Sequence, residues 1–96
     1  MTKLTAKEQQ MLKAFIDEGR NHGAETAQEL IEDNMTWQDA DFLAEELGWN
    51  KQEIGGVMSA LEAKGLICDY GEPIAEKRAP NAWTATDKGI QIGWGL

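Results

Sequence analysis

Two apolar stripes at helical spacing, separated by a short segment that contains one glycine, constrain the fold of this chain more than any other feature. The first stripe recurs every three or four residues, at Ala40, Leu43, Ala44 and Leu47. Gly48 follows, and the second stripe consists of Ile54, Val57, Met58 and Leu61. Residues at this spacing share one face of an α-helix, so the pattern predicts two helices that bury these faces together. We expect Leu12 and Phe15 to complete their core.

The second of these helices has clear ends but an unusual middle. Asn50 is a predicted N-cap, with Glu53 three residues later as the partner in a capping box. Lys64 and Gly65 predict its end, and Gly65 also falls on the predicted buried stripe. Gly55 and Gly56 stand side by side inside it, and each costs a helix roughly 1 kcal/mol relative to alanine. Their presence therefore calls for a reason.

Two further helices are predicted before this pair. A capping box of Thr5 and Glu8 opens the first, and either Gly19 or Gly23 ends it; its apolar face is Met11, Leu12, Phe15 and Ile16. Thr26 and Glu29 predict a second box, opening a short helix that runs towards Asn34. Residues 35–37 fit either an extended segment or a lead-in to the next helix, which begins at Thr36 or Asp39 and ends at Leu47.

The end of the chain changes character. Leu66 to Tyr70 and Ala82 to Thr86 suit two strands, and residues 74–81 form a polar loop between them. Residues 87–92 predict a last short turn of helix, and residues 93–96 a tail in which Trp94 folds back onto the core or onto a second subunit. The expected architecture is a single α+β domain over residues 1–96, mostly α, with three to four helices and a β-hairpin.

Charge is distributed unevenly along the 96 residues. The net charge is −8, with eleven acids and four bases in residues 1–50 against six acids and five bases in residues 51–96. Residues 17–46 alone hold ten acids and one base. Because phosphates attract Lys and Arg, any surface that meets nucleic acid is expected in the second half.

Several classes of protein are not supported by the composition. There is one cysteine and one histidine, so we expect no disulfide and no metal, and Cys68 is predicted to be a small buried side chain. His22 is placed in a loop, and no nucleophile–base pair or phosphate-binding loop is recognisable, so neither an enzyme nor a cofactor is expected. No segment resembles a signal peptide or a membrane span, which makes the cytoplasm the default location.

Residues 43–57 combine these features into a helix-turn-helix pattern: a small Ala44, a turn at Gly48, and apolar residues on both sides. With the segments DADFLAEELGWNKQEIGGVMSALEAKGLI and WTATDKG, the chain resembles the winged helix-turn-helix family over roughly residues 4–92. It is most similar to MarR-like regulators and to small phage or plasmid relatives. The matching points are residues 64–67 and 86–89; Ala85 departs from the family, which usually has Leu there.

The resemblance implies binding to double-stranded DNA, as a transcription regulator of phage, plasmid or mobile-element origin. The outward face of the second helix would then enter the major groove, where Lys51 reaches phosphate or guanine and Gln52 pairs with adenine. The hairpin would place its cations along the minor groove. The expected DNA-binding residues are Asn50, Lys51, Gln52, Gly55, Gly56, Ser59, Lys77 and Arg78.

Two alternatives remain open. The glycines can instead pack against protein, either the first helix or a second subunit in a homodimer. The acidic surface of residues 17–46 can also be the functional one, in a protein-interaction module or inhibitor that engages a basic, nucleic-acid-binding host protein.

Overall fold

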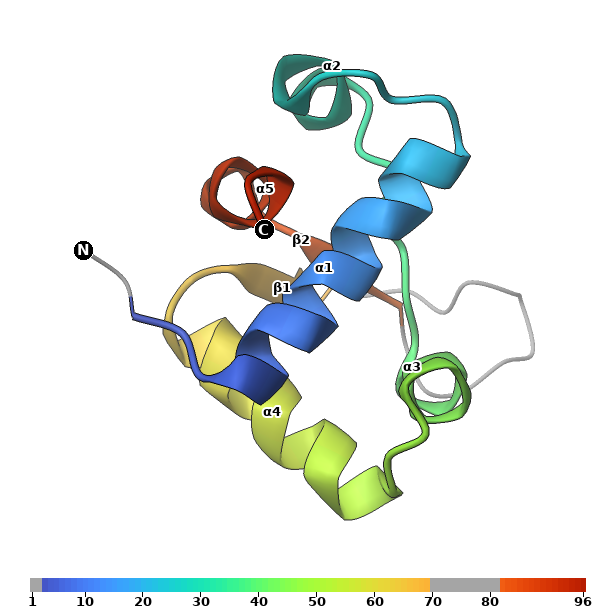
Figure 1. Cartoon of the computed structure of the whole chain (residues 1–96), viewed down its shortest axis with the longest axis vertical. Helices are drawn as coiled ribbons and strands as arrows, with labels where there is room; N and C mark the ends of the chain where they lie inside the picture. The colour runs from blue at the N-terminus through green and yellow to red at the C-terminus, as the bar shows by residue number, and fades with distance from the viewer. Residues whose placement is uncertain (1–2, 70–81) are drawn as a thin grey trace.

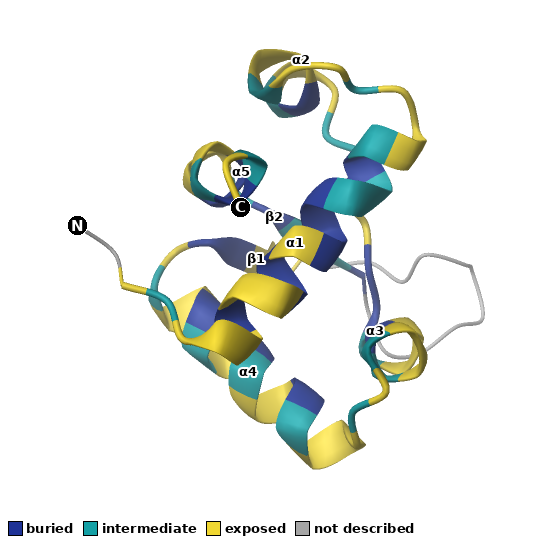
Figure 2. Ribbon diagram, viewed as in Figure 1, coloured by how far each residue is buried: buried dark blue, intermediate teal, exposed yellow. Residues whose placement is uncertain are grey.

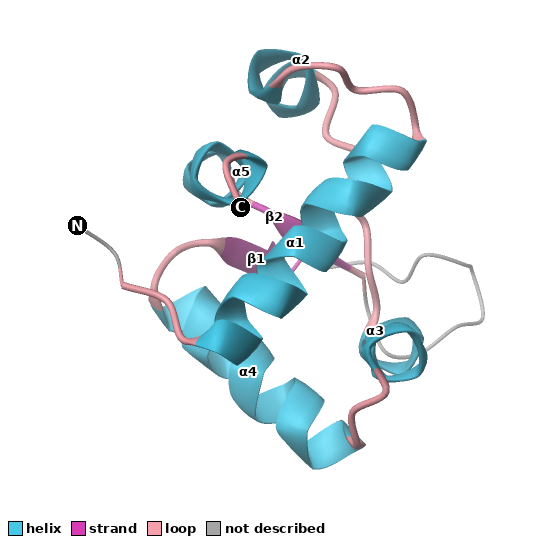
Figure 3. Ribbon diagram, viewed as in Figure 1, coloured by secondary structure: helices cyan, strands magenta, loops and turns pink. Residues whose placement is uncertain are grey.

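The computed structural model describes residues 3–69 and 82–96, and this part of the chain is mostly helical with one small sheet (Figures 1 and 3). In chain order the elements are α1 (Ala6–Asn21), α2 (Ala27–Glu32), α3 (Ala40–Leu47), α4 (Lys51–Ala63), β1 (Ile67–Asp69), β2 (Trp83–Ala85) and α5 (Asp87–Trp94). The predicted α+β class is confirmed, with five helices described where three or four were expected. No described helix has both the length and the apolar character needed to cross a bilayer.

Side chains cap the helices where the sequence predicts it. The Thr5 hydroxyl accepts a hydrogen bond from the Glu8 N–H at 3.2 Å, and Glu8 Oε1 accepts one from the Thr5 N–H at 2.7 Å, which completes the capping box of α1. Asp39, rather than Thr36, caps α3, because its carboxylate accepts from the Phe42 N–H at 2.7 Å. Asn50 caps α4 by accepting from the Glu53 N–H at 2.8 Å.

The other two predicted capping boxes are only half formed. Thr26 caps α2, but the Glu29 carboxylate accepts from the Glu25 N–H at 3.0 Å instead of reaching back to the cap. In α4 the Glu53 carboxylate forms an ion pair with Lys7 of α1. In both cases the glutamate has a competing donor within reach.

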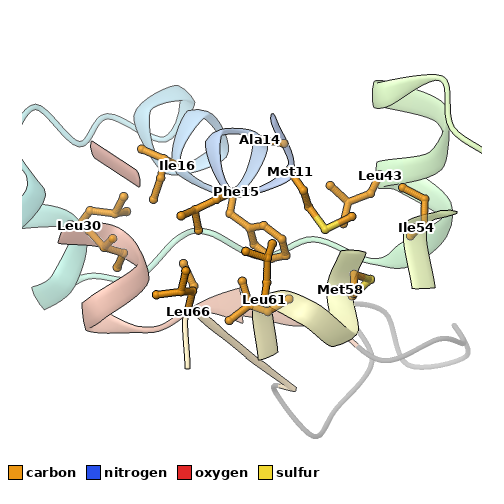
Figure 4. Close-up of a cluster of buried hydrophobic side chains, with 14 residues drawn as sticks. Met11, Ala14, Phe15, Ile16, Leu30, Leu43, Ile54, Met58, Leu61 and Leu66 are labelled. Atoms are coloured by element: carbon orange, nitrogen blue, oxygen red, sulfur yellow. The ribbon is translucent and has the colours of Figure 1, made fainter. Parts of the chain in front are cut away.

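Helix α1 lies at the centre, and the buried side chains of the other elements converge on it (Figure 4). The predicted core members that are fully buried are Leu12, Phe15, Leu43, Ile54 and Leu61, with Met58 5% exposed. Val57 and Leu47 were also expected inside, but both are only half-buried against this core. Val57 lies at the flank of its apolar stripe, and Leu47 is the last residue of α3, where neighbouring helices cover less of the surface.

The sheet is antiparallel, with Ile67 opposite Ala85 and Asp69 opposite Trp83. The segment before α3 extends it, since Gln38 and Trp83 exchange two backbone hydrogen bonds of 2.9 and 2.7 Å. The Thr36 hydroxyl is buried and accepts from the Ala85 N–H at 2.9 Å. Of the two predictions for residues 35–37, these bonds confirm the extended segment and not the helix lead-in.

Cys68 is exposed, so the prediction that it is buried is wrong. Successive side chains of a strand point to opposite faces, and Ile67 occupies the buried one. Cys68 therefore points outward, with its sulfur 3.4 Å from the Thr84 hydroxyl. Residues 66–68 are all apolar, so the sequence does not show which of them faces the core and which faces solvent.

The last helix is longer than predicted and extends through Trp94, so the expected tail is wrong for residues 93 and 94. Thr86 caps it by accepting from the Gly89 N–H at 3.1 Å. A side chain at Gly89 would place its Cβ 1.9 Å from the Leu66 carbonyl oxygen, and one at Gly93 would lie 2.7 Å from Ile16. The two glycines let α5 pack closely on Leu66 and Ile16. Sequence periodicity alone did not predict this close contact.

Candidate nucleic-acid interface

Helix α4 presents one face to the core and the other to solvent (Figure 2). Its buried residues, Ile54, Met58 and Leu61, pack into the cluster that contains α1 and α3. The connection between α3 and α4 is short, and Gly48 adopts the left-handed conformation there with φ of 73°. This turn fixes α4 with its N-terminal half at the surface.

Six of the predicted DNA-binding residues belong to the N-cap and the first three turns of α4. All six are exposed: Asn50, Lys51, Gln52, Gly55, Gly56 and Ser59. Lys51 has 85% of its side chain exposed. Asn50 differs from the others because its side-chain oxygen already serves as the helix cap.

The two adjacent glycines face open space. A Cβ atom built on either Gly55 or Gly56 would meet no atom of the described chain within 4 Å. The alternative that they pack against the first helix is therefore wrong, and packing within residues 3–69 and 82–96 does not explain them. They leave a shallow strip of bare backbone between Gln52 and Ser59.

This face carries little negative charge. Of the two acids in α4, Glu53 lies on the flank and is paired with Lys7, while Glu62 is one turn beyond Ser59 near the helix end. Lys51 Nζ lies 3.6 Å from the Asp41 carboxylate of α3, a pair so exposed that it contributes less than about 1 kcal/mol and leaves Lys51 able to reorient. The first three turns thus present one cation and small polar groups.

The two remaining predicted residues, Lys77 and Arg78, lie outside the residues that the structure describes. Within residues 3–69 and 82–96, no group of three or more His, Cys, Asp or Glu side chains is placed to hold a metal ion.

A second surface contains two aromatic side chains that the sequence pattern did not single out. Trp37 is 40% exposed and Phe42 is 51% exposed. The available signal was the helical wheel of α3, on which Phe42 falls between Glu45 and Glu46 on the charged side. A single exposed aromatic residue is common on protein surfaces, so Phe42 became informative only when the structure placed Trp37 beside the same pocket.

Comparison of the chain with protein-family models, with curated protein sequences and with solved structures finds no significant match. The described residues form a small, mostly helical α+β arrangement.

Proposed function

We propose that this chain is a winged helix-turn-helix protein that binds double-stranded DNA, with α4 as the recognition helix and a role in regulating transcription. Helices α3 and α4 supply the two helices, and Gly48 supplies the tight turn between them. The antiparallel pair of β1 and β2 after α4 is where a hairpin wing would begin. Fold alone does not define function, so the proposal depends on the α4 face.

The observation that carries it is the open strip at Gly55 and Gly56. Two adjacent glycines in the middle of a helix cost roughly 2 kcal/mol relative to alanines. No contact within the described chain requires them, since both would accept a Cβ into empty space. A major groove about 12 Å wide admits an α-helix, and bare backbone at its surface lets the helix lie deeper against base edges.

The polar residues around this strip suit that placement. Gln52 can form a bidentate pair with adenine, and Lys51 can reach either a phosphate or guanine. Ser59, two turns further on, can donate to a phosphate. All three are exposed; Gln52 and Ser59 lie on the outward face of α4, and Lys51 lies on its flank.

The low number of cations sets the expected strength and salt dependence. With a net charge of −8, the chain as a whole is repelled by DNA, and Lys51 is the one base on this part of α4. If about two or three phosphates are neutralised, the slope of log affinity against log salt is roughly −2 to −3. We therefore expect binding that is modest at physiological salt and less salt-sensitive than that of a strongly basic domain.

The test is fluorescence anisotropy of labelled duplex DNA, first a random pool and then sequences selected from it, at about 50 and 200 mM salt. Gly56→Glu is the diagnostic variant because it adds volume and negative charge to the open strip. Gln28→Glu is its control: it makes the same change in net charge on exposed α2. We expect Gly56→Glu to lose at least about tenfold in affinity and Gln28→Glu to change it less than about twofold.

Gly56→Glu should melt at or above the wild-type temperature, since its site is open. Gln28→Glu loses its hydrogen bond to Glu32 and places two carboxylates four residues apart, so it should melt slightly lower while remaining folded. Absence of wild-type binding at the lower salt would reject the proposal. Equal losses for the two variants would show that net charge, rather than the α4 face, governs the interaction.

A further inference from the structure

A pocket of about 320 Å³ opens between the C-terminal end of α1, the extended segment before α3, and α3 itself. Its apolar lining comes from Met35, Trp37 and Phe42, and its polar lining includes Glu18 and His22. Its volume is at the low end of the range of ligand pockets, about 300 to 1,000 Å³. The space suits a protruding side chain better than a cofactor.

The aromatic walls of this pocket are not needed by the core. In α3, Leu43 supplies the fully buried side chain, whereas Phe42 projects from the opposite side and is 51% exposed. Trp37 lies beside the bridge residue Gln38 and is 40% exposed. Partly exposed aromatic residues of this kind often anchor protein–protein interfaces.

Carboxylates surround this apolar centre. Glu18 lines the pocket, and Asp17 and Glu46 line the adjoining groove between α1 and α3. Desolvation and, after it, the nearby carboxylates of Glu18 and Asp17 raise the pKa of Glu46, while a hydrogen bond from the Gln38 side chain lowers it. Three acids thus lie close enough to repel one another.

The neighbouring bases compensate for this charge only in part. Arg20 lies 3.6 Å from Asp17, but its guanidinium also stacks on Trp94 at 4.2 Å and donates to the Trp94 carbonyl oxygen at 3.0 Å. His22 contacts Glu18 at 2.9 Å. Exposed Glu45 adds further negative charge along α3, whereas Asp41 is paired with Lys51, and Lys13 lines the groove beside Asp17 and Glu46. The surface is therefore an apolar pocket with a negative rim.

We propose that this pocket docks a basic segment of another protein, in which an apolar side chain enters between Trp37 and Phe42 and an arginine reaches Glu18 and Glu46. Arginine suits the rim better than lysine because its planar group binds carboxylates in a bidentate manner and stacks on aromatic faces. Bringing a cation to these acids relieves their mutual repulsion. The site shares no residue with the exposed strip of α4, and it does not depend on DNA binding.

Charge complementarity selects this occupant over others. Nucleic acid and anionic lipid carry the same sign as the rim. A second copy of the chain would bring an identical acidic rim into a two-fold contact, where like charges face one another. A cationic segment with one apolar anchor complements both parts of the surface.

The probe is a fluorescein-labelled nine-residue peptide with a central leucine flanked by arginines. Two matched peptides replace the leucine with serine or the arginines with glutamates. We expect the arginine–leucine peptide alone to bind in an anisotropy titration, and Phe42→Ser to weaken it about tenfold or more. Combining Glu18→Gln with Glu46→Gln should weaken it severalfold, and added salt should do the same.

The controls separate a defined site from general attraction to an acidic protein. The double variant Glu62→Gln with Asp87→Asn removes the same charge from exposed positions elsewhere, and we expect less than a twofold effect from it. Thermal melting confirms that each variant is folded. Equal losses for the two double variants, or equal binding of the serine peptide, would overturn the proposal. So would failure of the arginine–leucine peptide to bind, or a self-association in sedimentation velocity that Phe42→Ser abolishes, since a second copy would then occupy the pocket.

Discussion

Lys64 at the end of α4 binds both carboxylate oxygens of Glu8 at the start of α1, with Nζ 2.6 Å from Oε1 and 2.7 Å from Oε2. Glu8 is only 4% exposed, and it also completes the capping box with Thr5. The same ammonium group donates to the Lys3 carbonyl oxygen at 3.0 Å. One ion pair thus joins the first helix to the end of α4, across 56 residues of sequence.

Replacing Lys64 should destabilise the protein, because it leaves the buried Glu8 carboxylate without its charged partner. In Lys64→Met the Glu8 carboxylate keeps its bond from the Thr5 N–H but loses its charged partner, and we expect a loss of about 1 to 3 kcal/mol in the free energy of unfolding. Lys13→Met, at an exposed position of α1, is the matched control and should change stability by less than about 0.5 kcal/mol. Urea denaturation monitored by circular dichroism measures both. Overlapping curves for wild type and Lys64→Met would contradict the structure.

The same pair predicts how stability depends on pH. The hydrogen bond from Lys64, followed by that from the Thr5 N–H, lowers the pKa of Glu8 below its usual value of 4.5. The ionised carboxylate therefore stabilises the folded state fully at pH values above the unfolded-state pKa. That stabilisation is lost as the pH falls from about 4.5 through the lowered pKa. Denaturation midpoints of wild type and Glu8→Gln between about pH 7 and pH 3 should converge at the acid end. A constant difference across the range would show that the carboxylate charge is not the cause.

Two glycine-to-alanine variants should change stability in opposite directions. Gly55→Ala fills empty space and raises helix propensity, so we expect a gain of about 1 kcal/mol. Gly89→Ala drives a methyl group against the Leu66 carbonyl, at 1.9 Å before any adjustment, and we expect a loss of about 1 to 3 kcal/mol. Both residues are helical, so differences in backbone type do not confound the comparison. Thermal melts that shift the same way for both variants would contradict the placement of α5 on Leu66.

The two halves of the apolar stripe in α4 should also differ. Leu61 is fully buried in the central cluster, so Leu61→Ala opens a cavity and should cost about 2 to 5 kcal/mol. Val57 is half-buried at the edge, and we expect Val57→Ala to cost less than about 1 kcal/mol. Chemical denaturation of both variants measures the contrast. Similar losses would indicate that Val57 is as deeply packed as the stripe alone predicts.

The sequence by itself determined the helix starts and most of the core. Thr5, Thr26 and Asn50 cap helices as predicted because each is a short polar side chain followed by unpaired backbone N–H groups, a relationship that is local in the chain. The same locality made the exposed face of α4 predictable, since helical spacing puts Gln52, Gly56 and Ser59 opposite Ile54. The DNA-binding role of that face stays a prediction.

Tertiary structure decided what depends on contacts between segments far apart in sequence. Glu53 pairs with Lys7 instead of completing its own helix cap, and Gln38 pairs with Trp83 at the edge of the sheet. Helix α5 is longer than predicted because Gly89 and Gly93 allow it to pack closely against Leu66 and Ile16. Trp37 and Phe42 line one pocket with Glu18 because α1 and α3 pack side by side, which no local sequence pattern specifies. Local pattern specifies which face of an element is apolar, but only packing specifies which surfaces remain uncovered, because coverage depends on the shape and position of every neighbouring element.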